Sequence, residues 1–97
     1  MNLRVYKLID GQEIIAEWFS GDDAGMLKDS FILMPNMTPQ GMSIGLMPLL
    51  MFSDDDCIDV QPEHILYSYN PDKRLKGMYE QALTQFKAKR SGLILPG

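Results

Sequence analysis

The residues of this chain that are best suited to chemistry are few, and they form no recognisable catalytic group. His64 is the single histidine and Cys57 the single cysteine, and neither belongs to a Ser/His/Asp or Cys/His signature. One cysteine cannot build a zinc site, and no glycine-rich loop has the spacing that cradles phosphate. We therefore predict a protein that is not an enzyme, has no catalytic residues and needs no metal or other cofactor.

An acidic run at Asp54-Asp55-Asp56 offers the oxygen ligands that calcium and magnesium prefer. Consecutive side chains of an extended chain point in opposite directions, and no glycine or bidentate glutamate follows at the spacing of a calcium loop. We interpret the run as a solvated charge cluster that ends a strand, and we interpret Asp22-Asp23 in the same way. Cys57, which follows the run, is predicted to pack as a small apolar side chain.

Charge is distributed unevenly along the chain. Residues 1–72 carry three basic side chains against twelve acidic ones, whereas residues 73–97 carry six basic side chains against Glu80 alone. An acidic body repels phosphate, so broad electrostatic binding of DNA is disfavoured and any nucleic-acid site must be local. The basic cluster of Lys87, Lys89 and Arg90 could contact phosphate, but a helix C-terminus favours cations in any case, and an acidic neighbouring subunit would also attract them.

Length and composition predict one domain spanning residues 1–97. A chain of 97 residues with 45% hydrophobic residues supports one modest core. The longest apolar run, Leu46–Phe52, is far shorter than the roughly 18 residues of a membrane span, and the N-terminal residues lack the apolar core of a signal peptide. With one cysteine and no predicted membrane contact, a reducing, cytoplasmic location is expected.

The N-terminal part of the chain predicts a β-hairpin. Its arms are Arg4–Ile9 and Gln12–Phe19, and Asp10-Gly11 between them suits a type I′ turn because both residues tolerate positive φ. In the second arm Ile14, Ala16 and Trp18 share one face, while Glu13 and Glu17 lie on the other. We therefore expect Trp18 to face the core.

Further strands are expected after a turn-rich connection at residues 20–25. The third strand covers about residues 26–34 and ends at Pro35, residues 36–41 form a loop, and the fourth strand covers residues 42–52. Two short runs, residues 57–60 and 65–69, complete the strands. In the fourth strand Met47, Leu49 and Met51 create a second apolar face, which we expect a neighbouring subunit to cover.

The C-terminal part predicts a helix over residues 70–91, followed by an apolar tail at residues 92–97. Asn70 is a suitable N-cap, Pro71 suits the first helical position, and Gly92 can end the helix. Apolar residues at helical spacing predict a stripe that packs against the sheet. The stripe consists of Leu75, Met78, Tyr79, Ala82 and Phe86.

Together these elements predict a mainly β fold: a strongly bent, five-stranded antiparallel open barrel over residues 1–69 with a C-terminal α-helix. The order of hairpin, third strand, long fourth strand, sharp corner and short fifth strand resembles the Sm-like (LSm) fold, an SH3-like barrel. Residues 60–67 align with the second motif of that family, which runs aliphatic, Arg, Gly, polar pair, aliphatic, any residue, aromatic. Val60, Ile65 and Tyr67 match the framework, whereas Gln61 and Pro62 replace the Arg and Gly.

The resemblance implies a non-enzymatic ring of five to seven identical subunits whose pore-side loops bind RNA or single-stranded DNA. Its motifs give the following candidate nucleic-acid-binding residues: Gln61, Glu63 and His64 from the second motif, and Asp23 and Met26 from the first. A neutral His64 could stack on a base or donate to it, or it could be a surface histidine without a ligand.

The chain is also similar to small proteins of tailed phages, particularly cyanophages. This similarity keeps a second hypothesis open, a homo-oligomeric phage structural or assembly protein that binds protein partners in the host cytoplasm. The acidic body and the replaced Arg and Gly favour this second hypothesis over nucleic-acid binding.

Overall fold

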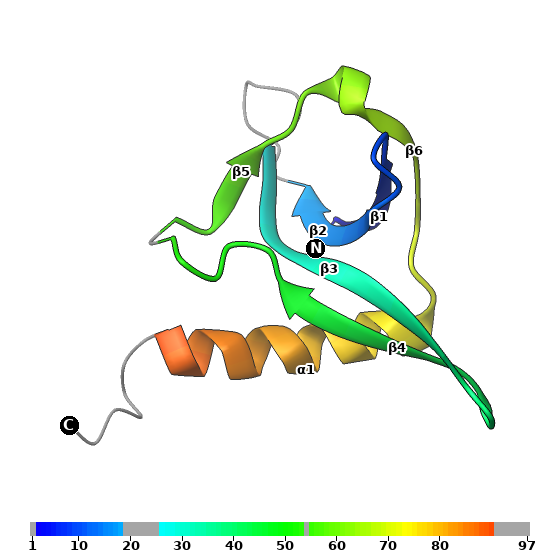
Figure 1. The fold of residues 1–97 in the computed structure, drawn as a ribbon. Helices are drawn as coiled ribbons and strands as arrows, with labels where there is room; N and C mark the ends of the chain where they lie inside the picture. The colour runs from blue at the N-terminus through cyan, green and yellow to red at the C-terminus, as the bar shows by residue number, and fades with distance from the viewer. Residues whose placement is uncertain (1, 19–25, 54, 91–97) are drawn as a thin grey trace.

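The computed structural model describes residues 2–18, 26–53 and 55–90, which form a bent antiparallel sheet with one C-terminal helix (Figure 1). The elements in chain order are β1 (Leu3–Leu8), β2 (Glu13–Trp18), β3 (Met26–Thr38), β4 (Gly41–Pro48), β5 (Cys57–Asp59), the 3₁₀ turn η1 (Pro62–His64), β6 (Ile65–Tyr69) and α1 (Lys73–Arg90). The sheet order is β4-β3-β2-β1-β6, and β5 pairs with the first part of β3. The sheet does not close into a complete barrel. The predicted mainly β fold, with an open antiparallel sheet and a C-terminal helix, is confirmed.

The β1–β2 hairpin forms as predicted, but its turn is not of type I′. The Leu8 N–H donates to the Gln12 carbonyl at 2.8 Å, and the Gly11 N–H donates to the Leu8 carbonyl at 3.0 Å, so three residues connect the strands. Gly11 has a φ of 94°, whereas Asp10 does not share the positive φ that a type I′ turn needs at both positions. Instead the Asp10 carboxylate accepts a hydrogen bond from the Gln12 N–H at 3.0 Å. The geometry is that of a three-residue loop closed by a left-handed glycine.

Strand β3 is longer than predicted because it continues through Pro35. Pro35 pairs with Ile44 of β4, and the expected loop at residues 36–41 is strand up to Thr38 and from Gly41. Pairing with β2 ends at Leu33, so beyond this point β3 has β4 as its one partner. A missing N–H is tolerated in a strand with a single neighbour. The result is a two-stranded ribbon that extends past the N-terminal end of α1 (Figure 1).

A bulge at Asp29 bends β3 between its two halves. The register against β2 shifts there, since Ile15 pairs with Phe31 but Glu17 pairs with Lys28. Asp29 has a φ of 54°, a left-handed conformation that aspartate adopts more readily than most residues. The bend lets the first half of β3 pair with β5 and the second half with β4.

The predicted fourth strand at residues 42–52 is too long, because β4 ends at Pro48.

Two apolar clusters lie on opposite faces of β1 and β2. One lies between the sheet and α1, and the other lies on the concave inner side of the sheet. The first contains Leu3, Val5, Ile15, Phe31, Leu33, Leu75 and Tyr79; the second contains Tyr6, Ile14, Ala16 and Leu27. Trp18 belongs to neither cluster and is 42% exposed, so the prediction that it faces the core is wrong. As the last residue of β2 it lies at the end of the strand, beyond the central positions that the two clusters bury.

The helix begins at Lys73, and its N-cap lies two residues later than predicted. The Asp72 carboxylate accepts a hydrogen bond from the Leu75 N–H at 2.9 Å, which makes Asp72 the N-cap. Asn70, the predicted cap, instead accepts a hydrogen bond from the Arg4 guanidinium at 2.9 Å, and Pro71 precedes the helix. The predicted apolar stripe faces the sheet, with Leu75 and Tyr79 buried. Gly92 and the predicted tail lie outside the described residues.

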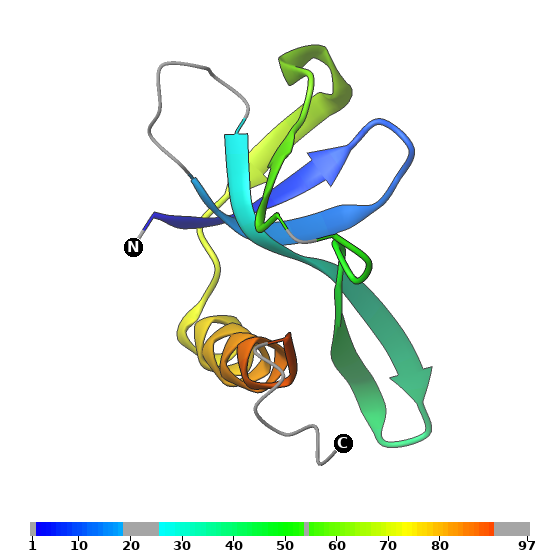
Figure 2. The same cartoon turned by 90° about the vertical axis from the view of Figure 1, so that its left-hand side faces the viewer.

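Tyr79 fixes the helix to the bend of β3. Its side chain is fully buried, and its ring packs edge-on against Phe31 with 5.6 Å between the ring centroids. The hydroxyl donates to the Asp29 carbonyl at 2.8 Å, and the Lys87 Nζ lies 3.4 Å from the Asp29 carboxylate. Burial raises the pKa of the Tyr79 phenol well above its usual value, so the hydroxyl remains a donor. Figure 2 shows the helix and the β3–β4 ribbon as two arms that diverge from the bent sheet.

Candidate functional site

Three of the predicted nucleic-acid-binding residues, Gln61, Glu63 and His64, lie together at the corner between β5 and β6. The His64 N–H donates to the Gln61 carbonyl at 2.8 Å, which closes the 3₁₀ turn. The Ile9 N–H donates to the His64 carbonyl at 2.9 Å, so the corner is tied to the β1–β2 turn. All three side chains are exposed. The corner therefore presents an amide, a carboxylate and an imidazole on a fixed backbone.

The two remaining predicted residues belong to the other motif of the resemblance. Met26 is the first residue of β3 and pairs with Asp59, two residues before Gln61, so it lies at the end of β5 that leads into the corner. Its side chain is half-buried, which limits its contact with any ligand. Asp23 lies outside the described residues.

Strand β6 carries an exposed aromatic pair that the sequence prediction did not include in the site. Tyr67 and Tyr69 alternate onto one face of the strand, with their ring centroids 6.4 Å apart. Tyr67 is 53% exposed and pairs with Lys7 across the sheet. The Tyr69 hydroxyl donates to the Glu13 carboxylate at 3.0 Å. Partial burial, and after it the bond to Glu13, raise the pKa of Tyr69 to about 12. The spacing of two tyrosines in a strand was the available signal for this pair.

The main strand order ends in β4 and β6, neither of which has a second partner among the described strands; the short β5 likewise pairs with β3 alone. Met47 on β4 and Leu66 on β6 are large apolar side chains that remain exposed. An outer strand of this kind presents unpaired backbone groups beside apolar surface, which is the usual template for pairing with another chain. Both edges are therefore candidate contact surfaces.

The predicted second apolar face of the fourth strand is not a strand face. Met47 lies in β4, but Leu49 and Met51 lie in the segment that follows it. The Leu49 N–H donates to the Ser30 carbonyl at 3.0 Å, and the Leu49 side chain is half-buried. Pro48 ends the strand before the alternation that the prediction assumed can continue. The edge of β4 thus carries less apolar surface than predicted.

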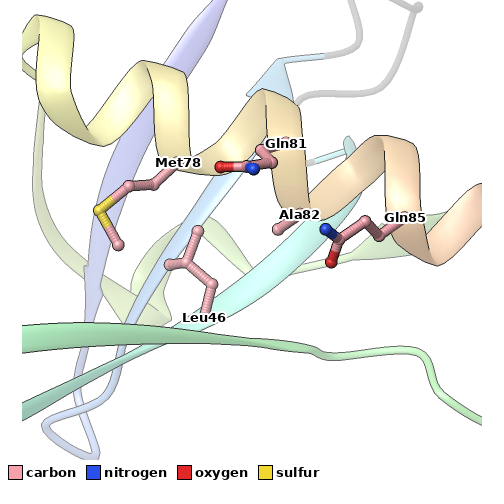
Figure 3. Close-up of a pocket in the computed structure, with 5 residues that line it drawn as sticks. All are labelled: Leu46, Met78, Gln81, Ala82 and Gln85. Atoms are coloured by element: carbon pink, nitrogen blue, oxygen red, sulfur yellow. The ribbon is translucent and has the colours of Figure 1, made fainter.

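A groove lies between α1 and β4, and both elements supply its walls (Figure 3). Its main part has a volume of about 320 Å³, with Leu46, Met78 and Ala82 as apolar lining and the amides of Gln81 and Gln85 beside them. Figure 3 shows Leu46 pointing from β4 toward the helix. A second part of about 220 Å³ shares Met78 and continues toward the start of the helix; its lining includes Ile44, Tyr69, Arg74 and Leu75.

The described residues contain no group of three or more His, Cys, Asp or Glu side chains placed to hold a metal ion. Of the acidic run, Asp56 has a structural contact, since its carbonyl accepts a hydrogen bond from the Asp29 N–H at 2.8 Å. Cys57 is half-buried, and its Sγ lies 3.4 Å from the Asp56 carboxylate. Desolvation and this bond raise the pKa of the Cys57 thiol, which keeps it protonated and weakly nucleophilic.

A scan of protein-family models finds none that matches the chain, and a search of curated proteins finds no match either. Within the described part of the chain, α1 is too polar to serve as a membrane span, and no other helix qualifies. The arguments about function therefore depend on the geometry of the two sheet edges, the groove and the corner at Pro62–His64.

Proposed function

We propose that the protein is a non-enzymatic assembly module that forms a closed ring of five to seven copies. In each contact, β4 of one copy pairs with β6 of the next. The observation that carries this proposal is the open sheet, in which β4 and β6 each have a partner on one side alone among the described strands and both bear exposed apolar side chains. The two edges differ in sequence, so their contact is head-to-tail and leaves neither of these two edges free once the rotation closes.

The energetics of a sheet edge support such a contact. Pairing β6 with β4 would satisfy backbone groups in both strands and cover Met47 and Leu66, which are exposed in the single copy. Stable interfaces bury about 1,200–2,000 Å² in total, and two short strands supply only part of that area. Side chains next to the strands must therefore contribute to the contact.

Complementary edge variants test the head-to-tail contact. Met47→Lys disfavours strand pairing at the β4 edge, and Leu66→Lys disfavours it at the β6 edge, because a lysine on an outer strand opposes the addition of another strand. We expect each variant alone to be monomeric, and an equimolar mixture to form a dimer through the one intact edge of each variant. Phe52→Ser is the matched control, since it removes a 97% exposed apolar side chain outside both strands and should leave the assembly intact.

Two results would contradict the proposed contact. If both edge variants assemble as wild type does, the edges are not the interface. If each is monomeric but their mixture stays monomeric, the contact is not head-to-tail between β4 and β6.

Binding of single-stranded RNA or DNA at the ring axis is the second part of the proposal. The observation that favours it is the corner of Gln61 and His64, whose side chains are exposed on a backbone fixed by hydrogen bonds. A ring repeats this corner in every copy, so weak contacts act together. Glu63 is repeated too and repels phosphate, which leaves the bases as the groups that His64 would stack on or donate to.

A titration of oligo-U and oligo-dT at low salt tests this second part. We expect weak, salt-sensitive binding that His64→Ala reduces and Glu63→Gln improves. Substitution of Lys87 and Lys89 by Gln is the control, because both lie on the helix away from the corner. Absence of binding at high micromolar protein would instead favour a ring that binds protein partners, as in a phage structural or assembly protein.

A further inference from the structure

The groove between α1 and β4 borders the β4 edge and has room for a large side chain. Leu46, Met78 and Ala82 give it an apolar lining, and Gln81 and Gln85 place amide groups beside that lining (Figure 3). Amides both donate and accept hydrogen bonds. The groove therefore suits a side chain with an apolar body and a polar end, and among natural side chains tyrosine has this form.

The sheet geometry identifies which side chains would reach the groove when β6 of a second copy extends the sheet beyond β4. Tyr69 pairs with Val5, which packs in the cluster beneath the helix, so Tyr69 lies on the helix-covered face of the sheet. Strand alternation places Tyr67 on the same face and Leu66 on the other. On β4, Leu46 also lies on the helix-covered face, since it packs against the same cluster.

We propose that Tyr67 of one copy inserts into the groove between α1 and β4 of the next copy, an inference that rests on the proposed edge-to-edge assembly. Its ring packs on Met78 and Ala82, and its hydroxyl bonds to the amides of Gln81 and Gln85. Tyr69 is less suited to this role because its hydroxyl is already bonded to Glu13 within its own chain. A buried tyrosine adds about 150–250 Å² to the interface, area that the two strands lack.

Charge complementarity points to a second copy as the occupant rather than an unrelated peptide. Helix α1 carries six basic residues against one acidic residue, and Arg74 lines the groove near the helix start. The end of β5 carries Asp59, the corner that leads into β6 carries Glu63, and residues 1–72 are strongly acidic. The strand corner of one copy is therefore attracted to the helix of the next.

Cross-linking between single-cysteine proteins tests the insertion. In a Cys57→Ser background, differently tagged Tyr67→Cys and Gln81→Cys proteins are mixed, allowed to exchange subunits and treated with a short bismaleimide. We expect a cross-linked band with both tags in the mixture and no such band in either protein alone. Leu66→Cys mixed with Gln81→Cys is the matched control and should give little product, because Leu66 faces away from the groove.

Each outcome separates the groove contact from the ring itself. Ring-sized assemblies without a Tyr67→Cys to Gln81→Cys product would overturn the insertion while leaving the ring intact. A product from Leu66→Cys instead would show that the opposite face of β6 meets the helix, and a Gln81→Cys homodimer would place a second helix in the groove. Either of these results overturns the proposal, and a monomeric wild type overturns both the groove contact and the ring.

Substitutions at Tyr67 add a quantitative test. Tyr67→Ala should raise the protein concentration at half-assembly at least about tenfold, as expected for loss of a central aromatic anchor. Tyr67→Phe keeps the ring and loses the amide contacts, so a smaller shift of about two- to fivefold is expected. A shift for Leu66→Ala that equals or exceeds that of Tyr67→Ala would contradict the assignment of Tyr67 as the anchor.

Discussion

Removal of the Tyr79 hydroxyl tests how the helix is held to the bend of β3. The phenol is fully buried and donates to the Asp29 carbonyl at 2.8 Å, while the ring packs on Phe31. Tyr79→Phe keeps the ring contact and deletes the hydrogen bond. Tyr79→Ala deletes both and leaves a cavity between the helix and the sheet.

The expected magnitudes follow from these contacts. An intramolecular hydrogen bond contributes about 0.5–1.5 kcal/mol net, and an acceptor left unpaired in a buried place adds a desolvation cost. We therefore expect Tyr79→Phe to lower the free energy of unfolding by about 1–2 kcal/mol. Tyr79→Ala should cost about 3–5 kcal/mol. In a domain of this size, 1 kcal/mol corresponds to a fall in Tm of about 4–8 °C.

Urea unfolding at several protein concentrations measures these changes in the free energy of unfolding separately from any effect of the substitutions on assembly. The slope of the free energy of unfolding against urea concentration should stay unchanged for Tyr79→Phe, because the surface exposed on unfolding is the same. Ser43→Ala is the control, since Ser43 is an exposed hydroxyl with a long 3.4 Å bond to the Asn36 carbonyl, and it should cost less than about 0.5 kcal/mol. A Tyr79→Phe variant as stable as wild type would refute the anchoring role of this hydroxyl.

Three further predictions concern the helix N-cap at Asp72, the ring of Phe86 and the phenol of Tyr69. Asp72→Ala should cost about 1 kcal/mol in urea unfolding because it removes the N-cap, and Asn70→Ala should cost less; the reverse order would place the cap at Asn70. Phe86→Ala should cost about 2 kcal/mol, less than for a fully buried ring, because Phe86 is half-buried against Phe31; an unchanged Tm would show a loosely attached helix end. The pKa of Tyr69 is raised from 10.0 to about 12, so its contribution to stability is present below pH 10 and is lost as the pH rises toward 12; Tyr69→Phe should flatten this part of the stability profile, and an unchanged slope would contradict the assignment.

Local signals in the sequence predicted most of the elements. Asp10-Gly11 marked the first hairpin, and the spacing of Leu75, Tyr79 and Phe86 marked the helix and its buried face. The type of the first turn and the residue at which the helix begins could not be predicted from local sequence alone. Several loop geometries accept an Asp-Gly pair, and both Asn70 and Asp72 are good capping residues, so the choice depended on Arg4, which is distant in sequence and bonds Asn70.

The errors on β2 and β3 arose from tertiary contacts. Pro35 normally ends a strand, but β3 continues because it has a single neighbour at that point. Trp18 was expected in the core but is exposed, because it lies at the end of β2, beyond the buried Ile14 and Ala16 on its own face. Ile15 is buried as well, because the helix covers the second face of β2. Alternation within one strand cannot reveal a layer supplied by a helix at residues 73–90.

The candidate site was predictable in part. The corner of Gln61, Glu63 and His64 followed from its polar residues between two strands. The groove did not, because Leu46 and Met78 approach each other only through the packing of α1 beside β4. The exposure of Tyr67 likewise depends on β6 being the outer strand, which the order of the strands along the chain does not specify.

The mass of the wild-type assembly tests the central claim most directly. Native mass spectrometry, with light scattering between about 1 and 100 μM protein, should give one species of five to seven times the 11.0 kDa chain mass. A discrete mass that does not grow with concentration is expected, because a closed ring leaves neither the β4 edge nor the β6 edge free. A monomer across this range, or a mass that increases without limit, would contradict a closed ring built from the β4 and β6 edges.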